Sequence, residues 1–310
     1  MSEPPAGRIE DVGAGRAWLR RSFGTRLGLL RHHGPRQLRI PDSYRAQDAP
    51  DPAPPISVVV PSLNQAAFVG RTLDSVLEQG YPALELIVED GGSDDGTAEL
   101  LAAYEGRVRV RSAPDDGQAD AINRGFAGSS GEIMAWLNSD DLSLPGTLAY
   151  VASHFAANPG TDVVYGHRIL IDEQDREIGR WALPEHDDAI LSWADYVPQE
   201  TIFWRRSIWE RAGGRLDTDF RFALDWELLL RFRDAGATFV RLPRYLGAFR
   251  VHDAQKSAER VTVGRPEMER LRERVHGRTV SQQEVGEAVK PYLRRHRRLD
   301  RLQRLGLVRD

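Results

Sequence analysis

The chain has no cysteine among its 310 residues. This absence excludes disulfide bonds and thiolate metal sites. No apolar run approaches the roughly 18 residues that a membrane-spanning helix needs. The start, MSEPPAGRIEDVGAG, lacks a cationic segment followed by an apolar one, so we see no secretory signal. We therefore expect a cytoplasmic protein, either soluble or peripheral at the inner face of the membrane.

Charge is spread unevenly along a chain whose net charge is -4. Residues 1–50 hold nine arginines against five acids, and residues 294–310 hold seven arginines against two. The middle is therefore strongly acidic, which argues against a broad nucleic-acid surface. The basic C-terminal tail, with leucines among its arginines, fits contact with an anionic membrane, contact with a second copy of the chain, or a solvated helix end. The sequence leaves these three open.

Strand and helix patterns alternate from residue 56 onward. The run Ile56–Pro61 is continuously apolar and β-branched, as in a parallel strand buried on both faces. Further strands are predicted at residues 84–88, 108–110, 132–137 and 162–165, and helices at 67–79, 96–104, 118–127 and 145–157. This alternation predicts a doubly wound α/β sheet, in which ligands bind beyond the carboxyl ends of the strands.

The second half of the chain is more mixed. The pattern predicts a hairpin over residues 168–181, helices at 207–212 and 224–235, strands at 238–242 and 246–251, and a helical segment from about residue 266. We expect three parts. Residues 1–55 form a basic extension that ends in the proline-rich linker DAPDPAPP, residues 56–257 form the α/β domain, and residues 258–310 form a helical, basic C-terminal extension.

Polar clusters directly follow three of the predicted strands. They occupy residues 61–64, 89–97 and 138–141, and the last two are rich in aspartate. Carboxylates that converge on one sheet edge repel each other unless they have a compensating partner. A hard divalent cation, bound by oxygen ligands and shared with phosphates, is the natural partner.

A resemblance to a known family is carried by stretches that occur in that family's order over about residues 56–257. They are VVVPSLNQAAFVGRTLDSVLEQ, IVEDGGSDDGT, DDGQADAINRGF, GEIMAWLNSDD, DVVYG, PQETIFWRRSIWERAGG, LDWELLLRF and FRVHDAQKS. On these stretches the chain resembles a family 2 glycosyltransferase with the GT-A fold. The resemblance implies a nucleotide-binding, doubly wound mixed sheet with an acceptor-side subregion.

The resemblance also implies nucleotide contacts at the strand ends. Asp90 would accept a hydrogen bond from the imide N–H of the base, which selects uracil or thymine. Pro61 would present its backbone near the nucleoside, and Ser62 and Asn64 would do likewise. Taken without the resemblance, Asp90 is a turn residue that satisfies backbone N–H groups in a glycine-rich loop.

Asn138, Ser139 and Asp140 occupy the place of the family's Asp-any-Asp motif. By resemblance, Asp140 would ligate Mn²⁺ or Mg²⁺ bridging the donor's diphosphate oxygens, and His252 would complete the metal site or contact the diphosphate. Asn138 brings no charge, so its amide oxygen would contact ribose or a metal-bound water, with Asp141 assisting. In isolation these residues are a loop or helix cap and a surface histidine.

Asp120 lies in the stretch DDGQADAIN, which is similar to a family stretch that packs against donor ribose or diphosphate. Asn123, in the same predicted helix, would share that site. The alternative for Asp120 is an acid in the first turn of a helix, which the helix dipole favours.

Asp225 begins an apolar helix where the resemblance places the family's catalytic base. Inverting transfer needs one carboxylate that takes the proton of the acceptor hydroxyl while its oxygen attacks the anomeric carbon. Glu227 lies about 200° further round the helix, so both cannot face one substrate. We take Asp225 as the base and place Glu227 and Gln199 on the acceptor side. The alternative for Asp225 is a helix N-cap.

We expect an inverting, metal-dependent transferase that moves a sugar from a UDP- or dTDP-linked donor to an unidentified hydroxyl acceptor, in polysaccharide or glycoconjugate synthesis. A sugar-phosphate nucleotidyltransferase is disfavoured, because the loop after the first strand lacks the glycines and basic residues of that chemistry. A non-catalytic nucleotide-sugar-binding protein on the same fold remains the alternative. The joint presence of Asp140 and Asp225 favours the enzyme.

Overall fold

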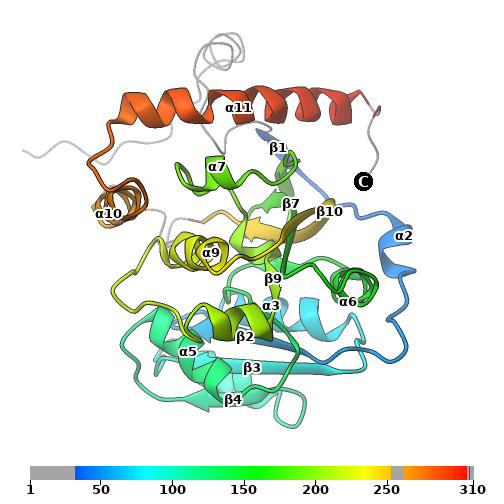
Figure 1. The fold of residues 1–310 in the computed structure, drawn as a ribbon. Helices are drawn as coiled ribbons and strands as arrows, with labels where there is room; N and C mark the ends of the chain where they lie inside the picture. The colour runs from blue at the N-terminus through cyan, green and yellow to red at the C-terminus, as the bar shows by residue number, and fades with distance from the viewer. Residues whose placement is uncertain (1–31, 253–261, 306, 308–310) are drawn as a thin grey trace, which may run out of the picture.

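A computed structural model describes residues 32–252, 262–305 and 307 (Figure 1). Ten strands of this described part form one mixed sheet. In spatial order they are β1 (His32–Arg36), β8 (Glu177–Trp181), β7 (Val163–Ile171), β9 (Phe203–Arg205), β5 (Ile133–Trp136), β2 (Ile56–Ser62), β3 (Leu84–Asp90) and β4 (Arg109–Ser112), with β10 (Phe239–Arg250) beside β7 and β6 (Leu142–Ser143) beside β10.

The first half of the sheet is parallel and covered on both faces. Strands β5, β2, β3 and β4 run in one direction, and every residue of β2 is buried. Val59 packs in one core cluster with Ile122 of α5 (Gln118–Ala127), whereas Val58 packs in another with Leu73 of α3 (Val69–Leu77). Because alternate side chains of a strand face opposite sides, the apolar run serves two helical layers. The predicted doubly wound α/β sheet is confirmed.

The second half of the sheet makes it mixed. Strand β9 runs antiparallel to both β5 and β7, while β10 runs parallel to β7. The two strands predicted at residues 238–242 and 246–251 are one strand, β10, whose pairing shifts register between Arg241 and Tyr245. Pro243 lies inside that interval and has no N–H to donate. A proline inside a strand is typical of a strand end, but here it only interrupts the hydrogen bonding between β10 and β7.

The remaining helices cover the sheet and its far end. They are α2 (Asp42–Arg45), α4 (Thr97–Ala102), α6 (Thr147–Ala157), α7 (Asp188–Leu191), α8 (Arg206–Arg211), α9 (Leu224–Asp234), α10 (Gly264–His276) and α11 (Gln282–Arg304), with a 3₁₀ turn at Gln199–Thr201. Ser281 and Glu284 form a capping box that starts α11. Figure 1 shows α11 lying across one end of the molecule, beside α7. The predicted helical C-terminal segment is therefore present.

Parts of both predicted extensions pack against the α/β body. Strand β1 pairs with β8 at the sheet edge, and the carbonyl of the buried Tyr44 accepts a hydrogen bond from Arg244 at 2.8 Å. Tyr292 of α11 is fully buried in the same core cluster as Trp226 of α9. The domain boundaries at residues 55 and 257 stay predictions. Within the described residues, no helix combines the length and apolar character needed to cross a bilayer.

Candidate active site

The three predicted polar clusters meet at one edge of the sheet. Strands β3, β2 and β5 are parallel neighbours, so their carboxyl ends lie side by side. Ser62 pairs with Asp90 in register, and the Gly91 N–H donates to the Ser62 carbonyl at 2.8 Å. Strand β5 ends at Trp136, and the chain then enters the 138–141 loop. This edge is where ligands of doubly wound sheets bind.

Asp140 and His252 come together at this edge. The Oδ2 atom of Asp140 lies 3.0 Å from Nε2 of His252. The His252 side chain is almost entirely covered, with 3% exposed, whereas 19% of the Asp140 side chain remains exposed. The ring of Phe68 packs against His252 with centroids 4.8 Å apart. One carboxylate oxygen and one imidazole nitrogen thus converge at a point that Asp140 keeps open to solvent.

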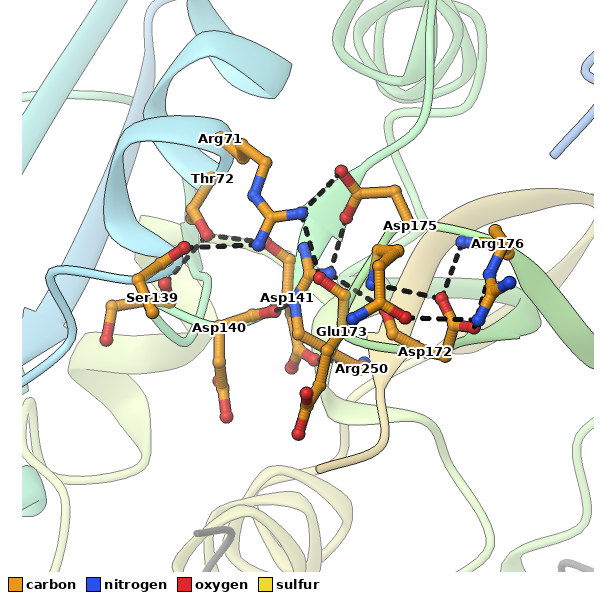
Figure 2. Close-up of polar contacts among 12 residues, drawn as sticks. Arg71, Thr72, Ser139, Asp140, Asp141, Asp172, Glu173, Asp175, Arg176 and Arg250 are labelled. Atoms are coloured by element: carbon orange, nitrogen blue, oxygen red, sulfur yellow. Dashed lines mark hydrogen bonds and ion pairs between the residues drawn. The ribbon is translucent and has the colours of Figure 1, made fainter. Parts of the chain in front are cut away.

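Asp141 turns inward from the same loop. Its Oδ1 accepts a hydrogen bond from the main-chain N–H of Arg250 at 2.9 Å, and the residue is 1% exposed. Burial, followed by the neighbouring Asp140 charge, raises the pKa of Asp141 well above its usual range. The Thr72 hydroxyl lies 2.8 Å from the carbonyls of both Ser139 and Asp141 (Figure 2). Asp141 therefore helps to hold the loop in place, and its predicted contact with the donor stays a prediction.

Asp225 stands at the first turn of α9 and keeps part of its surface exposed. Its Oδ1 accepts the Trp226 N–H at 2.9 Å. Burial raises the pKa of Asp225 to about 6. A carboxylate with this pKa is ionised at neutral pH and is a better proton acceptor than an exposed aspartate, because its basicity is closer to the working pH.

An ion pair links Asp225 to the Asp140–Asp141 loop electrostatically. Arg168 of β7 binds Glu200 through two hydrogen bonds, of which that from Nε is 2.6 Å long. The Glu200 side chain is fully buried and that of Arg168 is 13% exposed. Charges of both partners act on the pKa of Asp225 and on that of Asp141. The same buried pair therefore acts electrostatically on the candidate base and on the candidate metal loop.

With this geometry established, comparison with known proteins decides the family. The sequence model described as glycosyl transferase family 2 matches residues 57–221, slightly more than half of the chain. The chain belongs to this family. A Mycobacterium bovis glycosyltransferase of PGL/p-HBAD biosynthesis is 32% identical over 184 residues, which cover 58% of this chain and 70% of that protein. An uncharacterized Mycobacterium tuberculosis glycosyltransferase is 33% identical over 186 residues, with 58% and 69% covered.

Solved structures share the fold of this family 2 glycosyltransferase. A fragment of S. aureus TarS in complex with UDP-GlcNAc superposes with a TM-score of 0.59 and 17% identity, covering 78% of this chain and 72% of that one. A Pyrobaculum calidifontis mannosyltransferase in complex with GDP-Man and Mn²⁺ gives a TM-score of 0.57 and 21% identity, covering 79% and 70%. At these identities the likeness concerns the fold, and it confirms the expected GT-A architecture.

Asp90 of the glycosyltransferase is held by its own loop. Its oxygens accept hydrogen bonds from the hydroxyls of Ser93 and Ser112, at 2.5 and 2.6 Å, and from the main-chain N–H of Gly92 and Ser93. The residue is 2% exposed. These contacts are those of the turn residue that the sequence offered as an alternative. The contact with a nucleobase stays a prediction.

The other predicted nucleotide residues lie at the end of β2 and just beyond it. Pro61 and Ser62 are buried, and the Ser62 hydroxyl has no hydrogen-bond partner among the described residues. Asn64 adopts a left-handed backbone with φ of 54°. It ties the two loops together, because its N–H donates to Ser93 and its Oδ1 accepts from Asp94. Asn64 therefore joins the two loops, and its contact with a nucleoside stays a prediction.

Residues of α5 are likewise engaged. Asp120 forms an ion pair with Arg124 at 2.6 Å. The Asn138 amide oxygen accepts from Gln118 at 2.7 Å, which joins the start of α5 to the metal loop. Asn123 binds the main chain of Leu216 through both ends of its amide. Asn123 therefore fixes the loop before α9, whereas Asp120 and Asn138 keep partial exposure.

The two residues predicted on the acceptor side have different surroundings. Gln199 is 8% exposed and donates to the Trp136 carbonyl at 2.9 Å, so it lies directly behind the end of β5. Glu227 is 1% exposed and binds Arg231 and Arg274 at 2.8 and 2.9 Å. Two guanidinium groups thus engage the Glu227 carboxylate, which favours a structural role, and its acceptor-side placement stays a prediction.

Sequence reasoning missed three charged residues that organise the site: Arg168, Glu200 and Arg250. Glu200 and Arg250 stand inside two of the stretches that carry the family resemblance, PQETIFWRRSIWERAGG and FRVHDAQKS. The signal in the sequence was an ionisable residue within or beside an apolar strand. Such a residue is expected to be buried, and a buried charge requires a partner of opposite charge. The identity of each partner was not in the sequence pattern.

Proposed function

We propose that this glycosyltransferase is an inverting, divalent-metal-dependent enzyme that moves a sugar from a UDP- or dTDP-linked donor to an unidentified hydroxyl acceptor, in polysaccharide or glycoconjugate synthesis. The proposal depends on one observation: Asp140 and His252 meet at the carboxyl edge of the sheet, 3.0 Å apart. The charges of the buried Arg168–Glu200 pair act on the pKa of Asp225 and on that of Asp141, the neighbour of Asp140 in the same loop.

The two candidate metal ligands, Asp140 and His252, support Mn²⁺ or Mg²⁺ as the bound ion. A carboxylate oxygen and an imidazole nitrogen suit Mn²⁺ in particular, whereas Mg²⁺ prefers oxygen. Within the described residues, no group of three or more His, Cys, Asp or Glu side chains could hold a metal ion. Ions of this kind commonly take one or two protein ligands and complete their shell with phosphate oxygens and water. The bound metal would neutralise charge on the departing diphosphate.

Asp225 is proposed as the base. Its carboxylate would accept the proton of the acceptor hydroxyl as the hydroxyl oxygen forms a bond to the anomeric carbon. The bond from that carbon to the diphosphate oxygen breaks with its electron pair, so the nucleoside diphosphate leaves and the configuration inverts. Arg168 would favour the ionised form of Asp225, because its positive charge lowers the carboxyl pKa against the effect of burial.

Donor recognition is proposed for the loops at the ends of β2, β3 and β5. Asp90 would select uracil or thymine, with Pro61, Ser62 and Asn64 around the nucleoside. A carboxylate oxygen has more than one acceptor site, so the loop contacts of Asp90 leave it capacity for an imide N–H. Asp120 is proposed to contact the ribose or diphosphate of the donor. Asn138 would contact the ribose or a metal-bound water, and Asp141 would assist from the same loop.

Contact with an anionic membrane surface is proposed for the outer face of α11. Arg294, Arg298 and Arg301 are exposed at spacings of four and three residues, so they share one side of the helix. Leu305 and Leu307, just beyond, are 65% and 69% exposed. Arginines beside exposed leucines suit anionic headgroups and the acyl boundary beneath them. Contact between two copies of the chain is the competing use of this face.

A donor panel tests the reaction. The protein is incubated with Mn²⁺ and UDP-, dTDP- and GDP-linked sugars, and donor hydrolysis and thermal stabilisation are measured. We expect stabilisation and slow hydrolysis with a uracil or thymine donor and a product of inverted anomeric configuration by NMR. Stabilisation by nucleotide sugars without hydrolysis or transfer would favour the non-catalytic binding protein, and no stabilisation by any nucleotide with metal would contradict the proposal.

A further inference from the structure

We propose that Arg250 is a positioning residue that sets the geometry of the Asp140–His252 metal pair by holding Asp140 through its main chain. The inference rests on the proposed function, because it assumes that Asp140 and His252 hold a divalent cation. It assigns a role to a fully buried side chain.

Arg250 is fully buried at the last position of β10 and connects two segments that are distant in sequence. Its Nε donates to the Asp140 carbonyl at 2.7 Å, and its Nη1 donates to the Asp172 carbonyl at 3.0 Å and forms an ion pair with Asp175. Figure 2 shows Arg250 among the Ser139–Asp141 loop and the turn that joins β7 to β8. The side chain therefore fastens the loop to a rigid hairpin.

The contact leaves the Asp140 carboxylate available. In Figure 2 this carboxylate points away from the hydrogen-bonded network, while the Asp140 main chain takes part in it. Holding a ligand through its carbonyl fixes the direction of the side chain without using its oxygens. Fixed ligand orientation of this kind strengthens metal binding, since the ordering cost is met before the ion arrives.

Arg250 also supports the second member of the pair. Its guanidinium lies over the Phe68 ring, 4.9 Å from the centroid, and that ring packs against His252 at 4.8 Å. His252 follows Arg250 by two residues, so the strand end that bears the arginine also directs the histidine. Arg250 therefore contacts both the main chain of Asp140 and the ring that packs against His252.

Arg71 of α3 provides a matched control within the same network. Its guanidinium also lies over Phe68, at 5.4 Å, and its Nη1 also binds Asp175, at 2.8 Å. Its other contacts go to the carbonyls of Ala67 and Glu173, and no contact with the Ser139–Asp141 loop is seen in the described part of the chain. Arg71 thus shares the Phe68 and Asp175 contacts of Arg250 but lacks its bond to the Asp140 carbonyl.

The test measures Mn²⁺ binding directly, by the EPR signal of free Mn²⁺ in the presence of UDP, together with kcat at saturating Mn²⁺. We expect Arg250→Met to weaken Mn²⁺ binding by about tenfold or more, as removal of a group that orients a metal ligand does. Transfer at saturating Mn²⁺ should stay within about threefold. Arg250→Lys, which retains one donor, should recover part of the affinity, and Arg71→Met should change it by less than about twofold.

Thr72→Val covers the case in which Arg250→Met does not fold. The Thr72 hydroxyl contacts the Ser139 and Asp141 carbonyls of the same loop, so its removal should also weaken Mn²⁺ binding, by about threefold. Equal Mn²⁺ affinity for wild type, Arg250→Met and Thr72→Val would overturn the inference alone. Loss of affinity in Arg71→Met as large as in Arg250→Met would also overturn it. A wild type that binds no Mn²⁺ with UDP would overturn the proposed function as well.

Discussion

The carboxylate of Asp140 and the imidazole of His252 lie 3.0 Å apart, although 112 positions separate them in the chain. A short antiparallel ladder brings them together. Strand β6 begins two residues after Asp140, and its Leu142 and Ser143 pair with Ala248 and Gly247 of β10. His252 lies two residues beyond Arg250, the last residue of that strand. Main-chain pairing therefore sets the approach of the two side chains before any ligand binds.

Asp225→Asn should abolish transfer while preserving donor binding. The amide cannot accept the proton of the acceptor hydroxyl, so we expect kcat to fall by about 10²–10⁴-fold, the usual contribution of a positioned base. The Kd for UDP with Mn²⁺, measured by calorimetry, should change little. Transfer at the wild-type rate would refute the assignment of the base.

The same substitution should stabilise the fold at neutral pH. Burial raises the pKa of Asp225 from 3.8 to about 6. The stabilising effect of its neutral form is complete below the unfolded pKa and is lost as pH rises through about 6. At pH 7.5 the wild type therefore carries a cost on the order of 1 kcal/mol after solvent screening, which asparagine removes. Thermal unfolding should show a higher Tm for the variant at pH 7.5 than for the wild type, and the difference should shrink at pH 5.

The pH profile of transfer should have an acidic limb near pH 6. Asp225 accepts a proton only when ionised, and burial raises its pKa to about 6. With saturating Mn²⁺, kcat/KM should fall about tenfold for each pH unit below that value and level off above pH 7. Asp225→Glu is the comparison, since it keeps a carboxylate in altered surroundings. A flat profile from pH 5 to 8 would remove Asp225 from this role.

Glu227→Gln should destabilise the protein without affecting acceptor use. The substitution leaves Arg231 and Arg274 without the carboxylate that they share. Because both arginines are partly exposed, we expect a loss of about 2 kcal/mol, below the range for fully buried pairs. Urea unfolding should show the loss, while KM for the acceptor stays within about twofold. An acceptor KM raised tenfold at unchanged stability would restore Glu227 to the acceptor side.

Much of the nucleotide half of the fold was predictable because its signals are local. The run at residues 56–61 is apolar at consecutive positions, which indicates a strand covered on both faces, and the strand found is Ile56–Ser62. The helix predicted over residues 118–127 has those bounds in the structure. The prediction of two strands at residues 238–242 and 246–251 was wrong, because pairing with β7 continues on both sides of Pro243 and makes them one strand.

The residues at the strand ends of the site could be predicted from the sequence. The hydrogen bonds and ion pairs that connect them to other segments could not. The position of Asp140 after a strand was visible in the sequence. The bond from Arg250 to its carbonyl was not, because it depends on where the β7–β8 hairpin and β10 pack. The separation of about 200° between Asp225 and Glu227 on their helix followed from the sequence. The ion pair of Glu227 with Arg274 of α10 did not, because it depends on how the two helices pack.

Removing the basic face of α11 should release the protein from anionic vesicles. We expect wild type to co-sediment with vesicles of phosphatidylglycerol and phosphatidylcholine, and Arg294→Gln, Arg298→Gln and Arg301→Gln together to weaken binding by at least about tenfold. Raised salt should act similarly on wild type. Transfer to a water-soluble acceptor serves as the control and should not change.

The competing use of this face gives a different result. If α11 joins two copies of the chain, the triple variant becomes monomeric in sedimentation experiments and wild type shows no preference for phosphatidylglycerol over phosphatidylcholine alone. That pattern would contradict the membrane assignment.

The affinity of UDP with Mn²⁺ present and after chelation with EDTA, measured by calorimetry on wild type and Asp140→Asn, tests the central claim most directly. If Asp140 and His252 hold the cation that binds the diphosphate, wild type should bind UDP at least about tenfold more tightly with Mn²⁺, and Asp140→Asn should lose most of that difference. Equal UDP affinity in wild type before and after chelation would contradict the account.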